Sequence, residues 1–185
     1  MTAANLADHL LRTPARVRLR PTMQSDLDYV LSLERDAVNL PFITPWERVQ
    51  HEGAIRFPDF RHFIIEGGSG LDPVGFLILI GCRSQHHALE LKRMVVQAKR
   101  QGYGRAALRV AKRVAFDDLG AHRLWLDVKS RNVGAKALYD SEGFVLEGRL
   151  RESVRVGDGF DSLFVMSMLR PEFEARRAQA LELPG

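Results

Sequence analysis

Short apolar runs with two different periods divide the chain into predicted strands and helices. Residues 17–20 alternate between apolar and polar side chains, as a half-buried strand does, and Pro21 ends the run. Apolar residues then recur at helical spacing over residues 27–31, behind the helix-cap candidates Thr22 and Ser25. We therefore expect a first strand and a first helix, preceded by a mixed N-terminal lead-in over residues 1–14.

The following stretch combines prolines with apolar residues. Residues 40–46 contain two prolines and cannot form one regular helix, whereas residues 51–57 predict a short helix. The apolar runs at residues 62–66 and 74–80 are separated by a glycine-rich turn, which predicts a hairpin. We expect the proline-broken segment to face a substrate.

The second half of the chain alternates between strand and helix patterns and completes the predicted fold. The predicted elements are a strand at 89–96, a helix at 106–119, a strand at 124–128, a helix at 132–142, strands at 144–155 and 163–169 around a turn at 157–159, and a helix from Pro171. These elements predict an α/β (α+β) fold with a mixed sheet of about seven strands flanked by helices. The expected domain spans residues 15–170, with a C-terminal helix and tail over residues 171–185.

Composition narrows the class of protein. A chain of 185 residues, 45% of them hydrophobic, suits one globular domain with a full core. Lys and Arg number 27 against 23 for Asp and Glu, a net charge of +4 that favours a small polyanionic ligand. Basic residues alternate with acids and the aromatics lie mostly in apolar runs, so we expect no nucleic-acid binding.

The remaining chemistry-bearing residues point to no metal and no membrane. Cys82 is the single cysteine, and no apolar run approaches the roughly 20 residues that span a bilayer. We expect a soluble, cytoplasmic protein. The pair His86-His87 has no third metal ligand at a sensible spacing, so it predicts a turn.

A glycine turn between the strand at 89–96 and the following helix is the strongest functional signal. The segment reads Lys-Arg-Gln-Gly-Tyr-Gly-Arg-Ala over residues 99–106. Glycines permit positive φ and close approach of a ligand, and a helix N-terminus offers unpaired N–H groups and a positive dipole end. The turn therefore predicts an anion-binding site. Such turns also occur without any ligand, so the motif needs support from a second segment.

The second segment is Asn-Val-Gly-Ala-Lys-Ala-Leu-Tyr over residues 132–139, followed by Glu-Gly-Phe at 142–144. Together the two segments resemble the GCN5-related N-acetyltransferases (GNAT superfamily), whose motifs read Q/R-x-x-G-x-G/A and N-x-x-A-x-x-L-Y-x-x-x-G-F. The resemblance spans roughly residues 17–169 and is closest to the ribosomal-protein N-acetyltransferase-like branch. Lys99 departs from the family, which prefers Gln or Arg there. The resemblance implies a single, largely antiparallel GNAT-type domain.

The resemblance also implies acetyl-CoA as cosubstrate, with no metal. It assigns the pyrophosphate to the turn and the pantetheine arm to the end of the preceding strand, through the backbone of Met94, Val95 and Val96. Asn132 is either a further cofactor ligand or only a helix N-cap. The residues implied at the pyrophosphate are Arg100, Gln101, Gly102, Tyr103, Gly104, Arg105 and Ala106.

Two residues are predicted to carry the chemistry. Tyr139 matches the family's general acid, which protonates the departing thiolate, although its ring could instead simply pack in the core. Glu90 matches the position of a catalytic base in some members, or is an ordinary solvated strand residue; Asp127 and Glu34 are reserves. Trp46 is expected near an acceptor pocket, and Trp125 in the core.

We therefore expect an enzyme that transfers an acetyl group to a primary amine, by direct attack in a ternary complex. The acceptor is a protein N-terminus or a small amine, and an acidic pocket would favour a polyamine. Its walls would come from the first helix, residues 41–58 and the turn at 157–159. A noncatalytic acyl-CoA sensor or scaffold is the alternative, and a homodimer through the last strand pair remains open.

Overall fold

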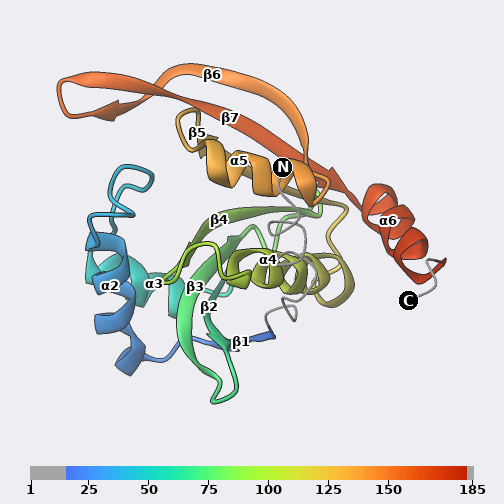
Figure 1. Cartoon of the computed structure of the whole chain (residues 1–185), viewed down its shortest axis with the longest axis horizontal. Coiled ribbons are helices and arrows are strands. Elements are labelled where there is room, and N and C mark those ends of the chain that lie inside the picture. Colours follow the sequence, from blue (N-terminus) through green and yellow to red (C-terminus); the bar gives the residue numbers. More distant parts are fainter. Residues whose placement is uncertain (1–15, 183–185) are drawn as a thin grey trace, which may run out of the picture.

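The computed structural model describes residues 16–182, and within them a single mixed sheet forms the centre of the molecule (Figure 1). The seven strands lie in the order β1-β2-β3-β4-β5-β7-β6, and every neighbouring pair except β4 and β5 is antiparallel. The predicted fold class is confirmed. The strands are β1 (Val17–Pro21), β2 (Phe60–Gly67), β3 (Asp72–Ile80), β4 (Ala88–Val96), β5 (Arg123–Lys129), β6 (Val145–Val156) and β7 (Gly159–Leu169).

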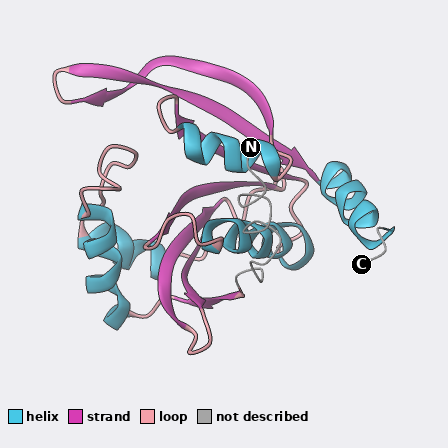
Figure 2. Cartoon of the chain, in the orientation of Figure 1, coloured by secondary structure: helices cyan, strands magenta, loops and turns pink. Residues whose placement is uncertain are grey.

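Helices cover both faces of the sheet, as the secondary-structure colours in Figure 2 show. One core cluster joins alternate residues of the central strands to α4 and α5, and a second joins the intervening residues to α2. Alternation of side chains along each strand explains the division. The helical elements are η1 (Gln24–Asp26), α2 (Leu27–Arg35), α3 (Arg48–Arg56), α4 (Tyr103–Arg113), η2 (Val114–Asp118), α5 (Val133–Ser141) and α6 (Arg170–Glu182).

Several element boundaries differ from the sequence prediction. Helix α4 begins at Tyr103, directly after the glycine turn, and ends in one π-helical turn, η2. Neither Thr22 nor Ser25 caps the first helix: Met23 stands at the N-cap of η1, where its N–H donates to the Asp26 carboxylate at 2.7 Å, and the Thr22 hydroxyl bonds to His62 instead. Strand β7 starts four residues before the predicted 163, at Gly159. The proposed lead-in lies outside the described residues.

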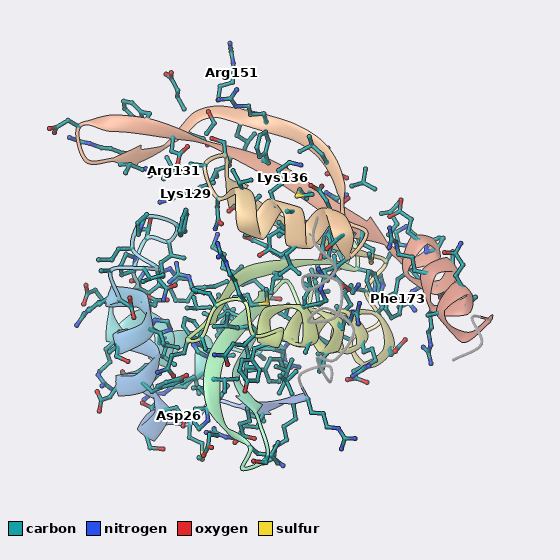
Figure 3. The ribbon with its side chains drawn as sticks, viewed as in Figure 1. Asp26, Lys129, Arg131, Lys136, Arg151 and Phe173 are labelled. Atoms are coloured by element: carbon teal, nitrogen blue, oxygen red, sulfur yellow. The ribbon has the colours of Figure 1, made fainter. Side chains whose placement is uncertain are left out.

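The last two strands form a long hairpin that extends beyond the rest of the sheet (Figure 1). Most of β6 is exposed, and Arg151 points away from the body of the molecule in Figure 3. Helix α6 follows β7 directly and is held to the core by Phe173, whose ring stacks on Phe116 with centroids 4.7 Å apart. The predicted C-terminal helix is confirmed.

The sheet is open at its one parallel pair. Strands β4 and β5 pair only at their first three positions, ending with Glu90 opposite Trp125. Strand β4 continues for six more residues to Val96, and β5 continues to Lys129, without pairing to each other. The two strands therefore separate toward their carboxyl ends, on the side where the glycine turn follows β4.

Candidate active site

The gap between β4 and β5 has a structural cause on its β3 side. The β3–β4 register skips Lys92, so β4 carries one extra residue there. At Gly75 an added Cβ would lie 2.2 Å from the carbonyl oxygen of Val95, which means that only glycine allows β4 to come so close to β3. The gap leaves main-chain groups of β4, including those of Met94, Val95 and Val96, without a β5 partner.

The glycine turn presents main-chain N–H groups at the end of this gap. Arg100 and Gly102 have positive φ, 61° and 85°, a backbone shape that forms anion-binding concavities. Gly102 is the N-cap of α4 and supplies no side chain to cap it. The Ala106 N–H already donates to the Gly102 carbonyl at 3.0 Å, so Ala106 is the least suited of the predicted pyrophosphate ligands.

The ring of Tyr103 fixes the turn against the β2–β3 hairpin. A Cβ added at Gly67 would lie only 2.7 Å from Tyr103 Cε1, so glycine is required for the ring to lie there. The phenol oxygen of Tyr103 also lies near Gly68. The start of α4 is therefore positioned by contacts with a segment that lies 36 residues earlier in the chain.

Helices α4 and α5 are joined by an ionic cluster around Glu142. Arg105, Arg109 and Lys112 of α4 contact this carboxylate at 2.7, 2.9 and 3.0 Å. Burial disfavours ionisation of Glu142, but the hydrogen bonds from Arg109, Lys112 and Arg105 outweigh it and lower its pKa to about 2. The Arg105 side chain is thus engaged in packing α4 against α5 rather than directed at the turn.

Tyr139 lies on α5 with its ring in the core and only 8% exposed. Its ring centroid is 5.8 Å from that of Phe144, so the packing role considered from the sequence is real. Among the described residues the phenol oxygen has no hydrogen-bond partner, which leaves it available to a ligand. Burial, and secondarily the charge of Asp127, raises the pKa of Tyr139 to about 12, so the phenol stays protonated at neutral pH.

Asn132 forms the N-cap of α5. Its Oδ1 accepts the Ala135 N–H at 3.2 Å, so the capping role is confirmed. At the other end, Gly143 with φ of 92° reverses the chain and lets the Phe144 N–H bond to the Tyr139 carbonyl at 3.0 Å. Both caps hold the helix that carries Tyr139.

The carboxylates considered as bases have different environments. Glu90 is the last β4 residue paired to β5, and its carboxylate accepts a hydrogen bond from Lys92 at 3.0 Å. Asp127 is half-buried on β5, on the face opposite Leu126, and forms no ion pair within the described part of the chain. Glu34 is fully buried and paired with Arg93, which makes it a structural group rather than a base.

The two tryptophans lie in different environments. Trp125 is only half-buried and points away from the core residues Leu124 and Leu126, so its assignment to the core was wrong. The reason is strand alternation, which an apolar run conceals. The Trp46 ring lies under the Arg93 guanidinium, 4.9 Å from its centroid. Trp46 lines a 560 Å³ pocket along α3, to which β4, β5 and the glycine turn contribute no residue.

We call the loop over residues 36–47, which follows α2, the acceptor loop, and we call β4 and β5, which border the gap, the cofactor strands. Cations from β5 and from the glycine turn after β4 contact this loop, and the sequence analysis missed these contacts. Lys99 donates to Asn39 Oδ1 at 2.7 Å and Lys129 to the Pro41 carbonyl at 3.1 Å. The one sequence signal was the departure from the family motif at Lys99.

His86 lies in a turn, and the described residues contain no group of three potential metal ligands. They also contain no helix long and apolar enough to cross a bilayer.

The chain is similar to known acetyltransferases over most of its length. It is 24% identical over 171 residues to spermidine N(1)-acetyltransferase of Escherichia coli (strain K12), covering 86% of this chain and 89% of that enzyme. The structure of spermidine N-acetyltransferase from Vibrio cholerae in complex with CoA and spermine has a TM-score of 0.77 at 22% identity, covering 85% of this chain and 98% of that one. A dodecameric structure of the Vibrio cholerae enzyme has a TM-score of 0.74, also at 22% identity, covering 86% and 97%.

These relatives carry the name of a polyamine acetyltransferase, so the narrower likeness to a ribosomal-protein branch stays a prediction. The family described as the acetyltransferase (GNAT) domain matches residues 16–145. That match includes the open strand pair, the glycine turn and the helix of Tyr139. The chain therefore belongs to the GNAT acetyltransferases, and it is an acetyl-CoA-dependent enzyme that acetylates amines.

Proposed function

We propose that the acceptor is a small polyamine of the spermidine class rather than a protein N-terminus. Similarity to spermidine N-acetyltransferases over 86% of the chain is the observation that carries this proposal. The charges near the gap support it. A polyamine that reacts at one nitrogen keeps a positive charge at another, which needs an anionic partner.

Glu90 and Asp127 supply two such carboxylates. Glu90 pairs in register with Trp125, and Asp127 lies two residues further along β5, so Glu90, Trp125 and Asp127 occupy one face of the sheet where the strands separate. In this proposal Asp127 binds a distal ammonium of the acceptor. Glu90 removes the proton from the reacting amine, directly or through water, because only the unprotonated amine is a nucleophile.

The reaction proceeds by direct attack while both substrates are bound. The main-chain N–H groups of Tyr103, Gly104 and Arg105 bind the pyrophosphate, and Arg100, Gln101 and Gly102 shape the turn. The unpaired edge of β4 binds the pantetheine arm, and the side-chain amide of Asn132 is a further cofactor ligand. The amine nitrogen bonds to the acyl carbon, the carbon–sulfur bond breaks, and the Tyr139 hydroxyl donates a hydrogen bond to the leaving sulfur.

The raised pKa of Tyr139 modifies this last step. A phenol with a pKa of about 12 is a weaker acid than a thiol with a pKa of about 8.5. Tyr139 therefore stabilises the developing thiolate mainly as a hydrogen-bond donor, and the solvent completes protonation once the product leaves. The Tyr139 hydroxyl also stays protonated at neutral pH, because its pKa is raised to about 12.

The acceptor is tested by measuring thiol release from acetyl-CoA with spermidine, with a primary monoamine of similar length and with peptides that have a free N-terminus. We expect kcat/KM for spermidine to exceed that for the peptides by at least about a hundredfold, since a missing charge contact of this kind costs about 3 kcal/mol. A faster reaction with peptides would overturn the polyamine assignment. Binding of acetyl-CoA without thiol release from any amine would support the sensor alternative.

Self-association is a second part of the proposal. One relative is described as dodecameric, and β6 here is an edge strand with exposed Val145, Leu146 and Leu150. Exposed apolar edge strands pair readily with other chains. We expect an oligomer through this hairpin, measurable by light scattering, and Leu150→Lys is expected to shift it toward the monomer.

A further inference from the structure

Ile43 and Trp46, near the end of the acceptor loop, pack against the core cluster that includes α2, but the first part of the loop has little hydrophobic attachment. Its large apolar side chains Val38, Leu40 and Phe42 are 58%, 44% and 38% exposed. Turn hydrogen bonds between Asp36 and Asn39 organise the loop internally but do not attach it to the sheet. Polar contacts therefore hold the first part of the loop, and they add to the packing at its end.

Three cations make these contacts, and each comes from an element that borders the cofactor gap. Lys99 of the glycine turn reaches Asn39, Lys129 at the end of β5 reaches the Pro41 carbonyl, and Arg93 of β4 reaches the Thr44 carbonyl at 2.8 Å. The contacts are evenly distributed along the loop. Figure 3 shows Lys129 between the end of β5 and this loop.

The receiving side of each contact is itself fixed. Asn39 is 6% exposed, and its Nδ2 donates to the Leu33 carbonyl at the end of α2 at 2.8 Å. Arg93 also pairs with Glu34 of α2, whose second oxygen accepts the Trp46 N–H at 2.6 Å. The loop is thus tied to α2 at both ends and to the cofactor elements along its length.

Lys99 connects the acceptor loop to the end of β4 most directly. Its ammonium donates simultaneously to Asn39 Oδ1 at 2.7 Å and to the carbonyl of Val96, the last residue of β4, at 2.8 Å. A shorter Gln side chain with one amide group could not span both positions in the same way, and the family motif has Gln or Arg here. Lys99 is therefore the residue that joins the loop to the end of β4 in this chain.

We propose that Lys99 and Lys129 are positioning residues that hold the acceptor loop against the cofactor strands and so set the affinity for the acceptor amine. The proposal rests on the proposed function for the identity of the acceptor, but not for the position of the loop. Neither lysine takes part in the chemistry.

The test uses the full chain with Lys99→Met, Lys129→Met and, as a matched control, Lys136→Met, whose ion pair with Asp140 lies on the surface of α5. Amide hydrogen exchange of residues 36–47 is the first readout because it needs no substrate. We expect exchange to be about tenfold faster in both lysine variants and unchanged in the control. Unchanged protection in both variants would overturn the proposal.

Kinetics provide the second readout. For either variant we expect the acceptor KM to rise about five- to tenfold, with the Kd for acetyl-CoA within about twofold and kcat little changed. A five- to tenfold fall in kcat with an unchanged acceptor KM would also overturn the proposal. If spermidine is not the acceptor, KM fails as a readout while hydrogen exchange still decides, so failure of the two proposals can be distinguished. The exposed Lys99 provides the variant least expected to disturb folding.

Discussion

In the proposed site, the cofactor side is built from main-chain groups, whereas the acceptor side is built from side chains that meet across long distances in the sequence. On the cofactor side, an eight-residue segment from Lys99 supplies the turn and the start of α4. On the acceptor side, Lys129 contacts Pro41, 88 residues away. Main-chain recognition depends on local glycine spacing, while a long-range side-chain contact depends on the whole fold.

Removing the Tyr139 hydroxyl is expected to have the largest effect and acts on the cofactor side alone. Tyr139→Phe keeps the ring against Phe144 but removes the donor, so we expect kcat to fall about 100-fold or more. The Kd for acetyl-CoA should stay within about twofold. Thiol release and calorimetry measure these quantities. If Tyr139→Phe turns over at the wild-type rate, Tyr139 only packs in the core and is not catalytic.

The ionic cluster between α4 and α5 has the next largest expected effect, on stability. Glu142→Gln leaves the buried Lys112 without its counter-charge, so we expect the free energy of unfolding to fall by about 2–4 kcal/mol in urea at pH 7. The surface variant Asp140→Asn is the control, with an expected change below about 0.5 kcal/mol.

The pH dependence of this difference follows from the lowered pKa of Glu142. Ionised Glu142 stabilises the folded state above the ordinary pKa of about 4.5, and the stabilisation is lost as the pH falls from there toward the folded pKa of about 2. The wild type and Glu142→Gln should therefore approach each other in stability over this range. A constant difference down to pH 2 would contradict the assignment.

Crowding the start of α4 is expected to have a smaller effect that is specific to cofactor binding. Gly67→Ala places a methyl group against the Tyr103 ring, and an overpacking cost of about 1–2 kcal/mol predicts a Kd for acetyl-CoA raised about tenfold. The double variant Gly67→Ala/Tyr103→Ala should recover part of the loss. Gly53→Ala, whose methyl group would meet nothing within 4 Å, is the neutral control.

The smallest expected effect is that kcat does not fall at alkaline pH. Because the pKa of Tyr139 is raised to about 12, the phenol remains more than about 90% protonated up to about pH 11. We expect kcat to show no fall between about pH 8 and about pH 10.5. A fall with an apparent pKa near 10 would show an ordinary, solvated phenol.

Most of the fold was predictable because its signals are local. The alternation at residues 17–20 and the helical spacing after the glycine turn each identify one element. Gly102 and Gly143 marked a helix start and a helix end, where their positive φ is required. The error at the first helix arose because Thr22 bonds to His62 instead, at 2.9 Å, a partner 40 residues away.

The site was predictable only in part. The turn, Asn132 and Tyr139 were identified by their motifs, whereas no pattern in the strands predicted the gap between β4 and β5. The orientation of Trp125 was missed because a continuous apolar run hides which face each residue occupies. The contacts of Lys99 and Lys129 required the fold, since nothing local relates them to residues 39 and 41.

The brief pairing of β4 with β5 has a mechanical consequence. Three residue pairs make up the strand pairing between one half-sheet, β1 to β4, and the other, β5 to β7. In the binding mode proposed above, a coenzyme arm along the open edge of β4 would replace the missing strand contacts, so it would complete the sheet as well as deliver an acetyl group. Loading of the coenzyme is therefore expected to strengthen the connection between the two halves of the sheet.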